Sequence, residues 1–240
     1  MSYTWWDELG EFKALHSMNA IRIPWIRDTL TRKYEQMPLS LASPLQDKVI
    51  LDAGSGGGIL TEPLARLGAS VIGIDMVEEN IKVAQTHLNQ DPHIVSRVKY
   101  IQAAVEDLVE TEEEKFDAVV SSEVVEHVSD LSTFISSCCK LLKPGGSLFI
   151  TTLNKTTMSY GLAVFAAENV LNLVPKGTHD WNKFIPPDDL QYMLDKNGLT
   201  RSLIHGIIYN PLTNRWTWIQ DTSINYALHA VKAEHSKHGI

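Results

Sequence analysis

Hydrophobic and polar positions follow two alternating patterns from residue 49 onward. Short runs of hydrophobic and β-branched residues are typical of buried strands, and stretches in which hydrophobic residues recur every three or four positions are typical of helices. We expect strands at 49–54, 70–75, 98–103, 116–122, 146–153, 202–209 and 225–233, and helices at about 59–67, 78–89 and 131–142. This order predicts an α/β fold with a mostly parallel sheet of seven strands, the last of them antiparallel, and helices on both faces.

Two segments lie outside this alternation. Residues 1–45 precede the first strand, and we interpret them as an N-terminal helical cover. Residues 155–185 follow the fifth strand and form an insertion that is too long for a simple crossover connection. We expect all 240 residues to form a single domain, because 44% of them are hydrophobic and can fill one sizeable core.

Charge and cysteine content exclude several classes of protein. The formal net charge is -8 and no basic stripe is present, which excludes a protein that binds nucleic acid through its phosphates. The two cysteines, Cys138 and Cys139, are adjacent and poorly placed to pair, so we expect reduced thiols. No hydrophobic run reaches the roughly 18 residues that span a bilayer, and the N-terminus has no signal-peptide features, so we expect a soluble chain.

The stretch "ILDAGSGGGI" at 50–59 joins the first predicted strand to the first helix. Such a glycine-rich turn exposes backbone N–H groups and lets a nucleotide-like ligand lie against the main chain. Gly54 and Gly56 match the first glycines of the dinucleotide fingerprint, but Ile59 stands in place of its last glycine and argues against a nicotinamide oxidoreductase. Asp75 ends the second strand, where a carboxylate accepts hydrogen bonds from ribose hydroxyls.

Longer segments resemble one methyltransferase family. The spacing of Asp52, Gly54, Gly56 and Gly58 is similar to the first motif of class I S-adenosylmethionine-dependent methyltransferases. Several segments resemble the ubiquinone-biosynthesis O-methyltransferases, in particular their mitochondrial, eukaryotic branch: "TWWDELGEFKALHSMNAIR" at 4–22, "FDAVVSSEVVEHVSD" at 116–130, "LKPGGSLFITTLNKT" at 142–156, "PKGTHDWNKFI" at 175–185 and "YNPLTNRWTW" at 209–218. Ser55 departs from the cysteine usual in these relatives. Because the glycine loop contacts its ligand through the backbone, we expect this serine to have little effect on cofactor binding.

The resemblance implies a fold, a reaction and a cofactor. The fold is the Rossmann-like class I methyltransferase fold with an insertion after the fifth strand. The reaction is methyl transfer from S-adenosyl-L-methionine to ring hydroxyls of polyprenylated catechol and benzoquinol intermediates of ubiquinone biosynthesis. Cofactor contacts carry over to Arg22, Gly54, Asp75 and Ser122, and the loop motif adds Gly56. Arg22 would bind the methionine carboxylate, because guanidinium groups bind carboxylates in bidentate fashion.

Glu123, Glu126 and His127 stand at positions i, i+3 and i+4 after the fourth strand. On a helical turn they would share one face. The family implies magnesium at these three residues, although an imidazole ligand suits zinc, manganese, cobalt or iron at least as well. Two alternatives remain: His127 acts as a metal-free general base, or the cluster is structural. We take Glu123 and His127 as the candidate catalytic residues.

The resemblance also implies partners and a location. A polyprenylated phenol is hardly soluble, so the enzyme must meet it at a bilayer or receive it from another protein. In the insertion, a helical apolar stripe suits peripheral contact with a membrane surface, although a lid over the site is an alternative: Met158, Leu162, Phe165, Ala166, Leu173 and Val174. Family members act at the matrix face of the mitochondrial inner membrane, within a biosynthetic complex, and carry a transit peptide that is absent from this chain. A cofactor-binding scaffold subunit of that complex is the alternative function.

Overall fold

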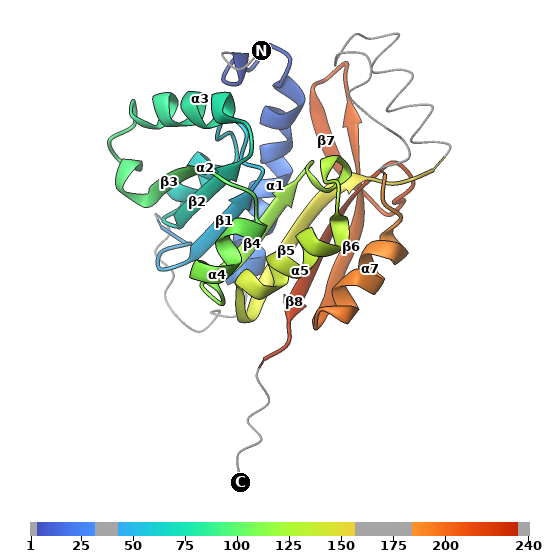
Figure 1. The fold of residues 1–240 in the computed structure, drawn as a ribbon. Helices are drawn as coiled ribbons and strands as arrows, with labels where there is room; N and C mark the ends of the chain where they lie inside the picture. Colours follow the sequence, from blue (N-terminus) through green and yellow to red (C-terminus); the bar gives the residue numbers. More distant parts are fainter. Residues whose placement is uncertain (1–3, 32–42, 157–183, 235–240) are drawn as a thin grey trace.

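An eight-stranded sheet with the order β3-β2-β1-β4-β5-β8-β6-β7 runs through the protein (Figure 1). The structure is a computed structural model that describes residues 4–31, 43–156 and 184–234. Its strands are β1 (Val49–Ala53), β2 (Ser70–Asp75), β3 (Val98–Gln102), β4 (Phe116–Ser122), β5 (Leu142–Leu153), β6 (Leu199–Asn210), β7 (Arg215–Ile219) and β8 (Asn225–Lys232). Its helices are α1 (Lys13–Thr31), α2 (Thr61–Arg66), α3 (Glu78–Leu88), α4 (Val109–Glu112), α5 (Leu131–Leu141) and α7 (Pro187–Lys196), with 3-10 turns η3 (Val95–Arg97), η4 (Glu106–Leu108) and η5 (Val125–His127).

The sheet is parallel from β3 to β5 and antiparallel beyond β5. The predicted α/β class, the mostly parallel sheet and the antiparallel last strand are confirmed. The predicted count of seven strands is wrong, because β7 pairs with β6 as a hairpin. The side chains of β7 are half-buried or exposed, so its sequence "RWTWI" has no continuous hydrophobic run to indicate a strand.

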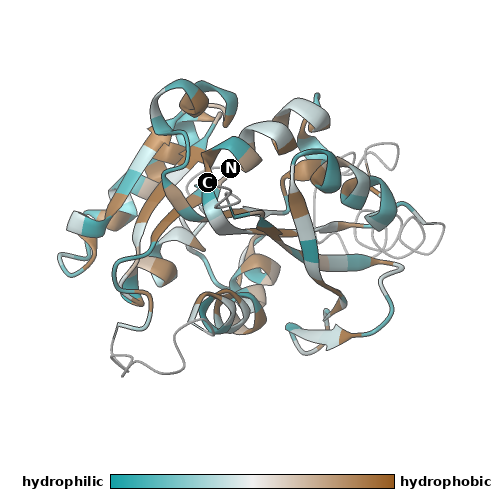
Figure 2. Cartoon of the chain, turned by 90° about the horizontal axis from the view of Figure 1, so that it is seen from below, coloured by the Kyte–Doolittle hydropathy of each residue, from teal (hydrophilic) through white to brown (hydrophobic). Residues whose placement is uncertain are grey.

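Helices cover both faces of the sheet. In Figure 1, α1 lies behind the sheet, whereas α4, α5 and α7 lie in front of it. The buried residues of α1 are four positions apart, as one helix face requires: Met18, Arg22, Ile26 and Leu30. In Figure 2 the central strands are largely hydrophobic, while the helices alternate between hydrophobic and hydrophilic positions, as expected when only one face of each helix packs on the sheet.

The predicted helices at 59–67, 78–89 and 131–142 agree with α2, α3 and α5 to within two residues. The predicted cover over 1–45 contains α1, but residues 32–42 lie outside the described chain. Most of the 155–185 insertion, with its apolar stripe, also lies outside it. Cys138 and Cys139 are buried free thiols, as expected. Among the described residues, none of the helices has the length and hydrophobicity that a bilayer crossing requires.

Candidate active site

The glycine loop leaves the carboxyl end of β1 in a conformation that requires glycine. The φ angles of Gly54, Gly56 and Gly58 are 82°, 53° and 91°, all in the left-handed region that side chains with a Cβ disfavour. A Cβ on Gly54 would overlap the side chain of Val124, which follows β4. The backbone N–H of Gly54 donates to the Ile74 carbonyl at 2.8 Å, so the loop is fastened to the end of β2.

Asp75 links this loop to the start of α3. Its Oδ2 accepts a hydrogen bond of 2.9 Å from the Gly56 backbone N–H. Its Oδ1 accepts hydrogen bonds from the Val77 backbone N–H at 2.8 Å and from Asn80 Nδ2 at 3.2 Å. Because a carboxylate has about four acceptor positions, the half-buried Asp75 keeps capacity for a ligand hydroxyl.

Arg22 reaches the carboxyl end of β4 from α1 and is buried. Its Nη1 donates to Ser122 Oγ at 2.5 Å, and its Nε and Nη2 donate to Asn19 Oδ1 at 3.1 and 2.5 Å. Ser122 Oγ lies 2.6 Å from Thr151 Oγ1 on β5. Burial lowers the pKa of Arg22 to about 10, against the opposing charges of Asp52 and Glu123, so the guanidinium stays charged at neutral pH. The structure thus brings Arg22 and Ser122 together.

Asp52 lies in β1 immediately before the loop and is buried. Thr61 Oγ1, at the start of α2, donates a hydrogen bond of 2.6 Å to Asp52 Oδ2. Burial raises the pKa of Asp52 to about 6, although the bond from Thr61 and the charge of Arg22 act in the opposite direction. This carboxylate joins β1 to the start of α2.

Two carboxylates follow the carboxyl end of β4: Glu123 is half-buried and Glu126 is buried. Glu123 adopts a φ of 56°, an unusual conformation for a residue with a side chain, and its backbone N–H donates to the Thr151 carbonyl at 2.9 Å. Thr152 Oγ1 donates to Glu126 Oε2 at 2.8 Å. Burial raises the pKa of both carboxyl groups, and the charge of Glu123 raises that of Glu126 further.

The prediction that Glu123, Glu126 and His127 share one helical face is wrong. The segment forms the short 3-10 turn η5 and not an α-helix, and Glu123 precedes that turn in the left-handed region. Glu126 is buried, whereas His127 is exposed. Within the described parts of the chain, no three histidine, cysteine, aspartate or glutamate side chains gather into a group that suits a metal ion.

The two carboxylates alone fit part of a cation site. Oε1 of Glu123 and Oε1 of Glu126 are buried and accept no hydrogen bond from the described residues. Buried carboxylate oxygens without partners are costly unless a cation or a donor approaches them. Oxygen donors of this kind suit magnesium, but the His127 imidazole does not join them in this arrangement.

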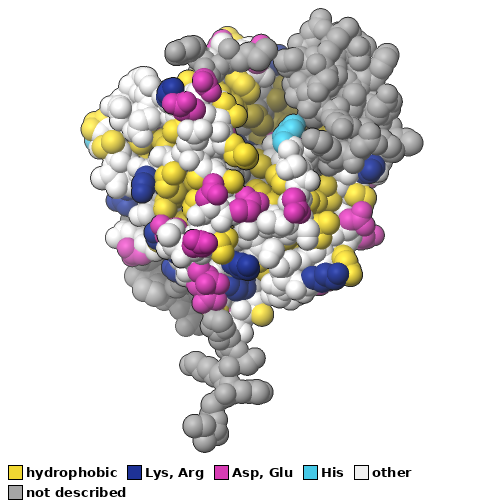
Figure 3. Space-filling model, viewed as in Figure 1, with side chains coloured by type: hydrophobic (Ala, Val, Ile, Leu, Met, Phe, Trp, Pro, Cys, Tyr) yellow, Lys and Arg dark blue, Asp and Glu magenta, His cyan; other side chains and the backbone are white. Residues whose placement is uncertain are grey.

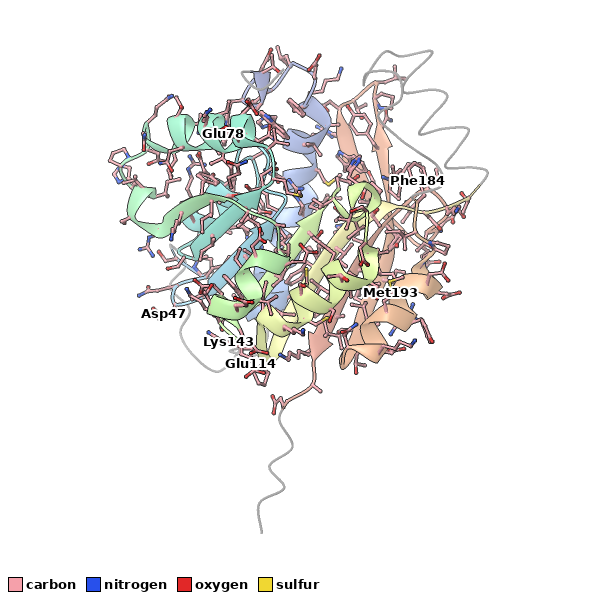
Figure 4. The ribbon with its side chains drawn as sticks, in the orientation of Figure 1. Asp47, Glu78, Glu114, Lys143, Phe184 and Met193 are labelled. Carbon is pink, nitrogen blue, oxygen red and sulfur yellow. The ribbon has the colours of Figure 1, made fainter. Side chains whose placement is uncertain are left out.

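A cavity of about 330 Å³ borders η5. Seven of its ten lining residues are hydrophobic, and the lining comes from η5, the start of α5, and the residues around α7: Val125, Val128, Ser129, Leu131, Lys155, Phe184, Ile185, Pro186, Asp189 and Met193. Figure 4 shows Phe184 and Met193 on the right of the molecule, whereas Lys143 and Glu114 lie at the bottom. Val125 belongs to η5, which also contains Glu126, so the cavity borders the turn that carries one of the two carboxylates.

Comparison with known proteins identifies the family. The methyltransferase domain family matches residues 51–150. Over 227 residues the chain is 45% identical to the ubiquinone biosynthesis O-methyltransferase of Methylobacterium nodulans, covering 95% of this chain and 89% of that protein. The chain belongs to the ubiquinone biosynthesis O-methyltransferase family. It is also 52% identical over 239 residues to the mitochondrial human member, covering 99% of this chain and 64% of that protein, so it spans just under two thirds of the human relative.

The fold of this family member also matches solved structures. The magnesium protoporphyrin IX methyltransferase of Synechocystis PCC 6803 with bound SAH superposes with a TM-score of 0.63 at 20% identity, covering 93% of this chain and 86% of that one. At this identity the likeness concerns the fold alone.

Sequence reasoning missed several residues of this candidate site. Asn80 holds Asp75, and Thr151 and Thr152 contact Ser122 and Glu126. Threonines at the end of a hydrophobic strand carry no recognisable spacing, although their place at the carboxyl edge of β5 could have indicated them.

Proposed function

We propose that this chain transfers the methyl group of S-adenosyl-L-methionine to an aromatic hydroxyl of a polyprenylated ubiquinone precursor. The observation that carries the proposal is the Asp75 carboxylate, which joins the glycine loop to α3 and retains acceptor capacity at the carboxyl edge of the sheet. A nucleoside in the loop would place its ribose at this carboxylate. Membership of the family supports the same cofactor and the same class of acceptor.

The donor would be held by its two ends. The backbone of Gly54 and Gly56 faces the nucleoside, and Asp75 accepts hydrogen bonds from the ribose. Arg22 and Ser122 would bind the amino-acid end of the cofactor, because a buried guanidinium attracts a carboxylate. A hydrogen bond of 2.5 Å already holds these two side chains together. Positioning of donor and acceptor supplies much of the catalysis in a reaction whose methyl group is already electrophilic.

The acceptor hydroxyl must lose its proton. A phenol with a pKa of about 10 is ionised in about one molecule per thousand at neutral pH, which corresponds to about 4 kcal/mol. Without a bound cation, the ionised form of one carboxylate of the Glu123–Glu126 pair would accept this proton, and its raised pKa makes it a stronger base. The acceptor oxygen then bonds to the methyl carbon while the carbon–sulfur bond breaks, and its electron pair stays on sulfur as S-adenosylhomocysteine leaves.

Glu123 and Glu126 would also hold a divalent cation, whose chemistry when bound is to lower the pKa of the acceptor hydroxyl. Their two oxygens without partners support this assignment. Magnesium suits these oxygens, whereas zinc, manganese, cobalt or iron would suit a set that includes His127. His127 as a metal-free base is the less supported alternative, because its side chain is exposed.

The apolar chain of the acceptor would lie in the 330 Å³ cavity beside η5. Val125 and Val128 line this cavity and flank Glu126 and His127 in sequence, so an aromatic ring at the carboxylates would have its substituent close to an apolar wall. Figure 3 shows hydrophobic side chains on this face of the molecule, with acidic side chains between them and basic side chains mainly toward its lower and outer parts.

The names of the relatives and the insolubility of the acceptor support a proposal on the protein's location and partners. Relatives named as mitochondrial support a mitochondrial location, and the insoluble acceptor supports peripheral contact with the matrix face of the inner membrane. The segment proposed for that contact, and for membership of a biosynthetic complex, is the 155–185 insertion.

Charged substitutions at Leu162 and Phe165 should reduce co-sedimentation with liposomes; unchanged co-sedimentation would contradict the membrane contact.

Methyl transfer to a short-chain prenylated catechol tests the reaction, the acceptor and the metal together. We expect transfer in the presence of divalent ions, a loss in chelator, and recovery as single ions are restored. Glu123→Gln and Glu126→Gln should each lower turnover by about 10²-fold or more, with binding of S-adenosylhomocysteine retained. Binding of the product without transfer to any catechol would contradict catalysis and favour the scaffold subunit. Loss of transfer in His127→Ala with transfer retained in both carboxylate variants would favour the metal-free base.

A further inference from the structure

The indole of Trp5 lies directly on the glycine loop. A Cβ added to Gly56 would lie 2.5 Å from Cη2 of Trp5, and a Cβ on Gly57 would meet the same side chain. Trp5 Nε1 donates a hydrogen bond of 3.0 Å to Asn80 Oδ1, and Asn80 Nδ2 in turn donates to Asp75 Oδ1 at 3.2 Å. Trp5 therefore contacts both parts of the candidate donor site, the loop and the partner of its carboxylate.

Trp6 fastens the same segment to the other side of the loop. Its Nε1 donates to the Gly57 carbonyl at 2.9 Å. Its ring stacks on His87 of α3, with 3.5 Å between centroids and 5° between planes. His87 Nδ1 lies 2.8 Å from Oε1 of Glu62, which is fully buried in α2. The contact thus reaches a side chain that is fixed in the core.

Contacts from α1 and from the residue just before it hold Trp5 in place. The Trp5 ring stacks on Phe12 with 3.8 Å between centroids and 3° between planes, and His16 Nε2 bonds to the Trp5 carbonyl at 2.8 Å. Asn19 Nδ2 donates to the Ile59 carbonyl at 2.8 Å. In Figure 1 the N-terminal residues lie beside α3, above the carboxyl ends of the strands.

Resting on the proposed function, we infer that Trp5 is a donor-positioning residue and that residues 4–12 form an N-terminal strap over the nucleoside of the donor. A ligand that lies against Gly56 and reaches Asp75 must contact the indole, because the indole covers the loop and is tied to Asn80. Because one face of the indole is stacked on Phe12, the ring forms a rigid apolar wall beside the loop, which a purine or ribose can contact at small conformational cost. Since the strap is attached at Gly57 and Asn80, the donor enters and the product leaves when these attachments open.

Exchange kinetics of S-adenosylhomocysteine test this inference. Stopped-flow measurements would compare the wild type with Trp5→Ala, Trp5→Phe and Trp6→Phe. Trp218→Phe is the matched control, since Trp218 lies on β7 and makes an edge-to-face contact with Trp25, away from the loop. We expect Trp5→Ala to weaken product affinity about tenfold, chiefly through faster dissociation. Trp6→Phe keeps the stacked ring but loses the bond to Gly57, so its dissociation should be about fivefold faster.

A fluorescence signal separates positioning from a structural role. Product binding should change tryptophan emission in the wild type and in Trp218→Phe, and this change should be largely lost in Trp5→Phe. The thermal stability of Trp5→Phe without ligand should match that of Trp218→Phe. Unchanged dissociation in both Trp5 variants, or tighter product binding in Trp5→Ala, would overturn the inference. If the wild type bound no product, the proposed function would fail. If the wild type bound and the variants matched it, only the strap would fail.

Discussion

The guanidinium of Arg22 donates a hydrogen bond of 2.5 Å to the hydroxyl of Ser122, one hundred positions later in the chain. This bond joins the helix that precedes the sheet to the carboxyl end of β4, where the reaction is proposed to occur. The family resemblance implies that both side chains contact the cofactor, although they come from segments far apart in the sequence. Their contact makes α1 part of the site, in addition to its role as cover for the sheet.

The first prediction concerns the geometry of Arg22. Arg22→Lys retains the charge but loses the planar group that bonds to Asn19 and Ser122 together, so the methionine end of the donor is no longer positioned. We expect the KM for S-adenosylmethionine to rise about tenfold, corresponding to about 1.4 kcal/mol. Arg27→Lys is the control on the same helix, because Arg27 is partly exposed and pairs with Asp28. Equal KM values for the two variants would contradict this role.

A second prediction follows from the backbone of Glu123. Its φ of 56° is readily adopted by glycine and disfavoured for alanine. Glu123→Gly should therefore have a free energy of unfolding about 1 kcal/mol higher than Glu123→Ala in urea denaturation, while both variants lose methyl transfer. If the alanine variant were as stable as the glycine variant, the strain attributed to this turn would be absent.

The third prediction concerns pH and Asp52. Burial raises its pKa in the folded state from 3.8 to about 6, so between these values the folded protein binds more protons than the unfolded chain. The contribution of Asp52 to stability is therefore greatest below about pH 4, falls as the pH rises to about 6, and is constant above. The total change from this group is about 3 kcal/mol.

Asp52→Asn removes this titration and keeps an acceptor for Thr61. The difference in free energy of unfolding between this variant and the wild type should grow in favour of the variant from pH 4 to pH 6. Glu78→Gln serves as the control, because Glu78 is exposed and pairs with Lys82. A difference that does not vary with pH would show that Asp52 has an ordinary pKa in the folded protein.

The fourth prediction tests the cavity beside η5. Met193→Trp would fill part of its volume and should raise the KM for a prenylated catechol without changing the KM for catechol itself. Tyr192→Trp is the matched control on the neighbouring position of α7, where the side chain is 60% exposed. Equal effects of Met193→Trp on both acceptors would place the apolar chain elsewhere.

The fold and the glycine loop of the candidate donor site were largely predictable, because their signals are local. The glycine loop, Asp75 and the strands before them combine special backbone conformations with short hydrophobic runs, and both can be recognised from residue types. The strand β7 was missed because its side chains are half-buried or exposed and its pairing with β6 is formed by backbone hydrogen bonds.

The acid and histidine cluster was predicted in composition but not in geometry. Its spacing fits one face of an α-helix, whereas the left-handed turn at Glu123 and the 3-10 turn after it direct Glu126 inward and His127 outward. The bond from Thr152 to Glu126 and the packing of Val124 on Gly54 depend on tertiary contacts that residue spacing does not encode. The Trp-Trp-Asp opening served only as a family motif, because its contact with the loop spans some fifty residues.

The most direct test of the central claim is calorimetric titration of the wild type and of Asp75→Ala with S-adenosylhomocysteine. A separate titration with NAD tests the alternative cofactor class. We predict that the wild type binds S-adenosylhomocysteine and not NAD, and that Asp75→Ala binds at least about tenfold more weakly, because the carboxylate both shapes the loop and receives the ribose. Equal affinity of the two proteins for S-adenosylhomocysteine, or preference of the wild type for NAD, would contradict the account.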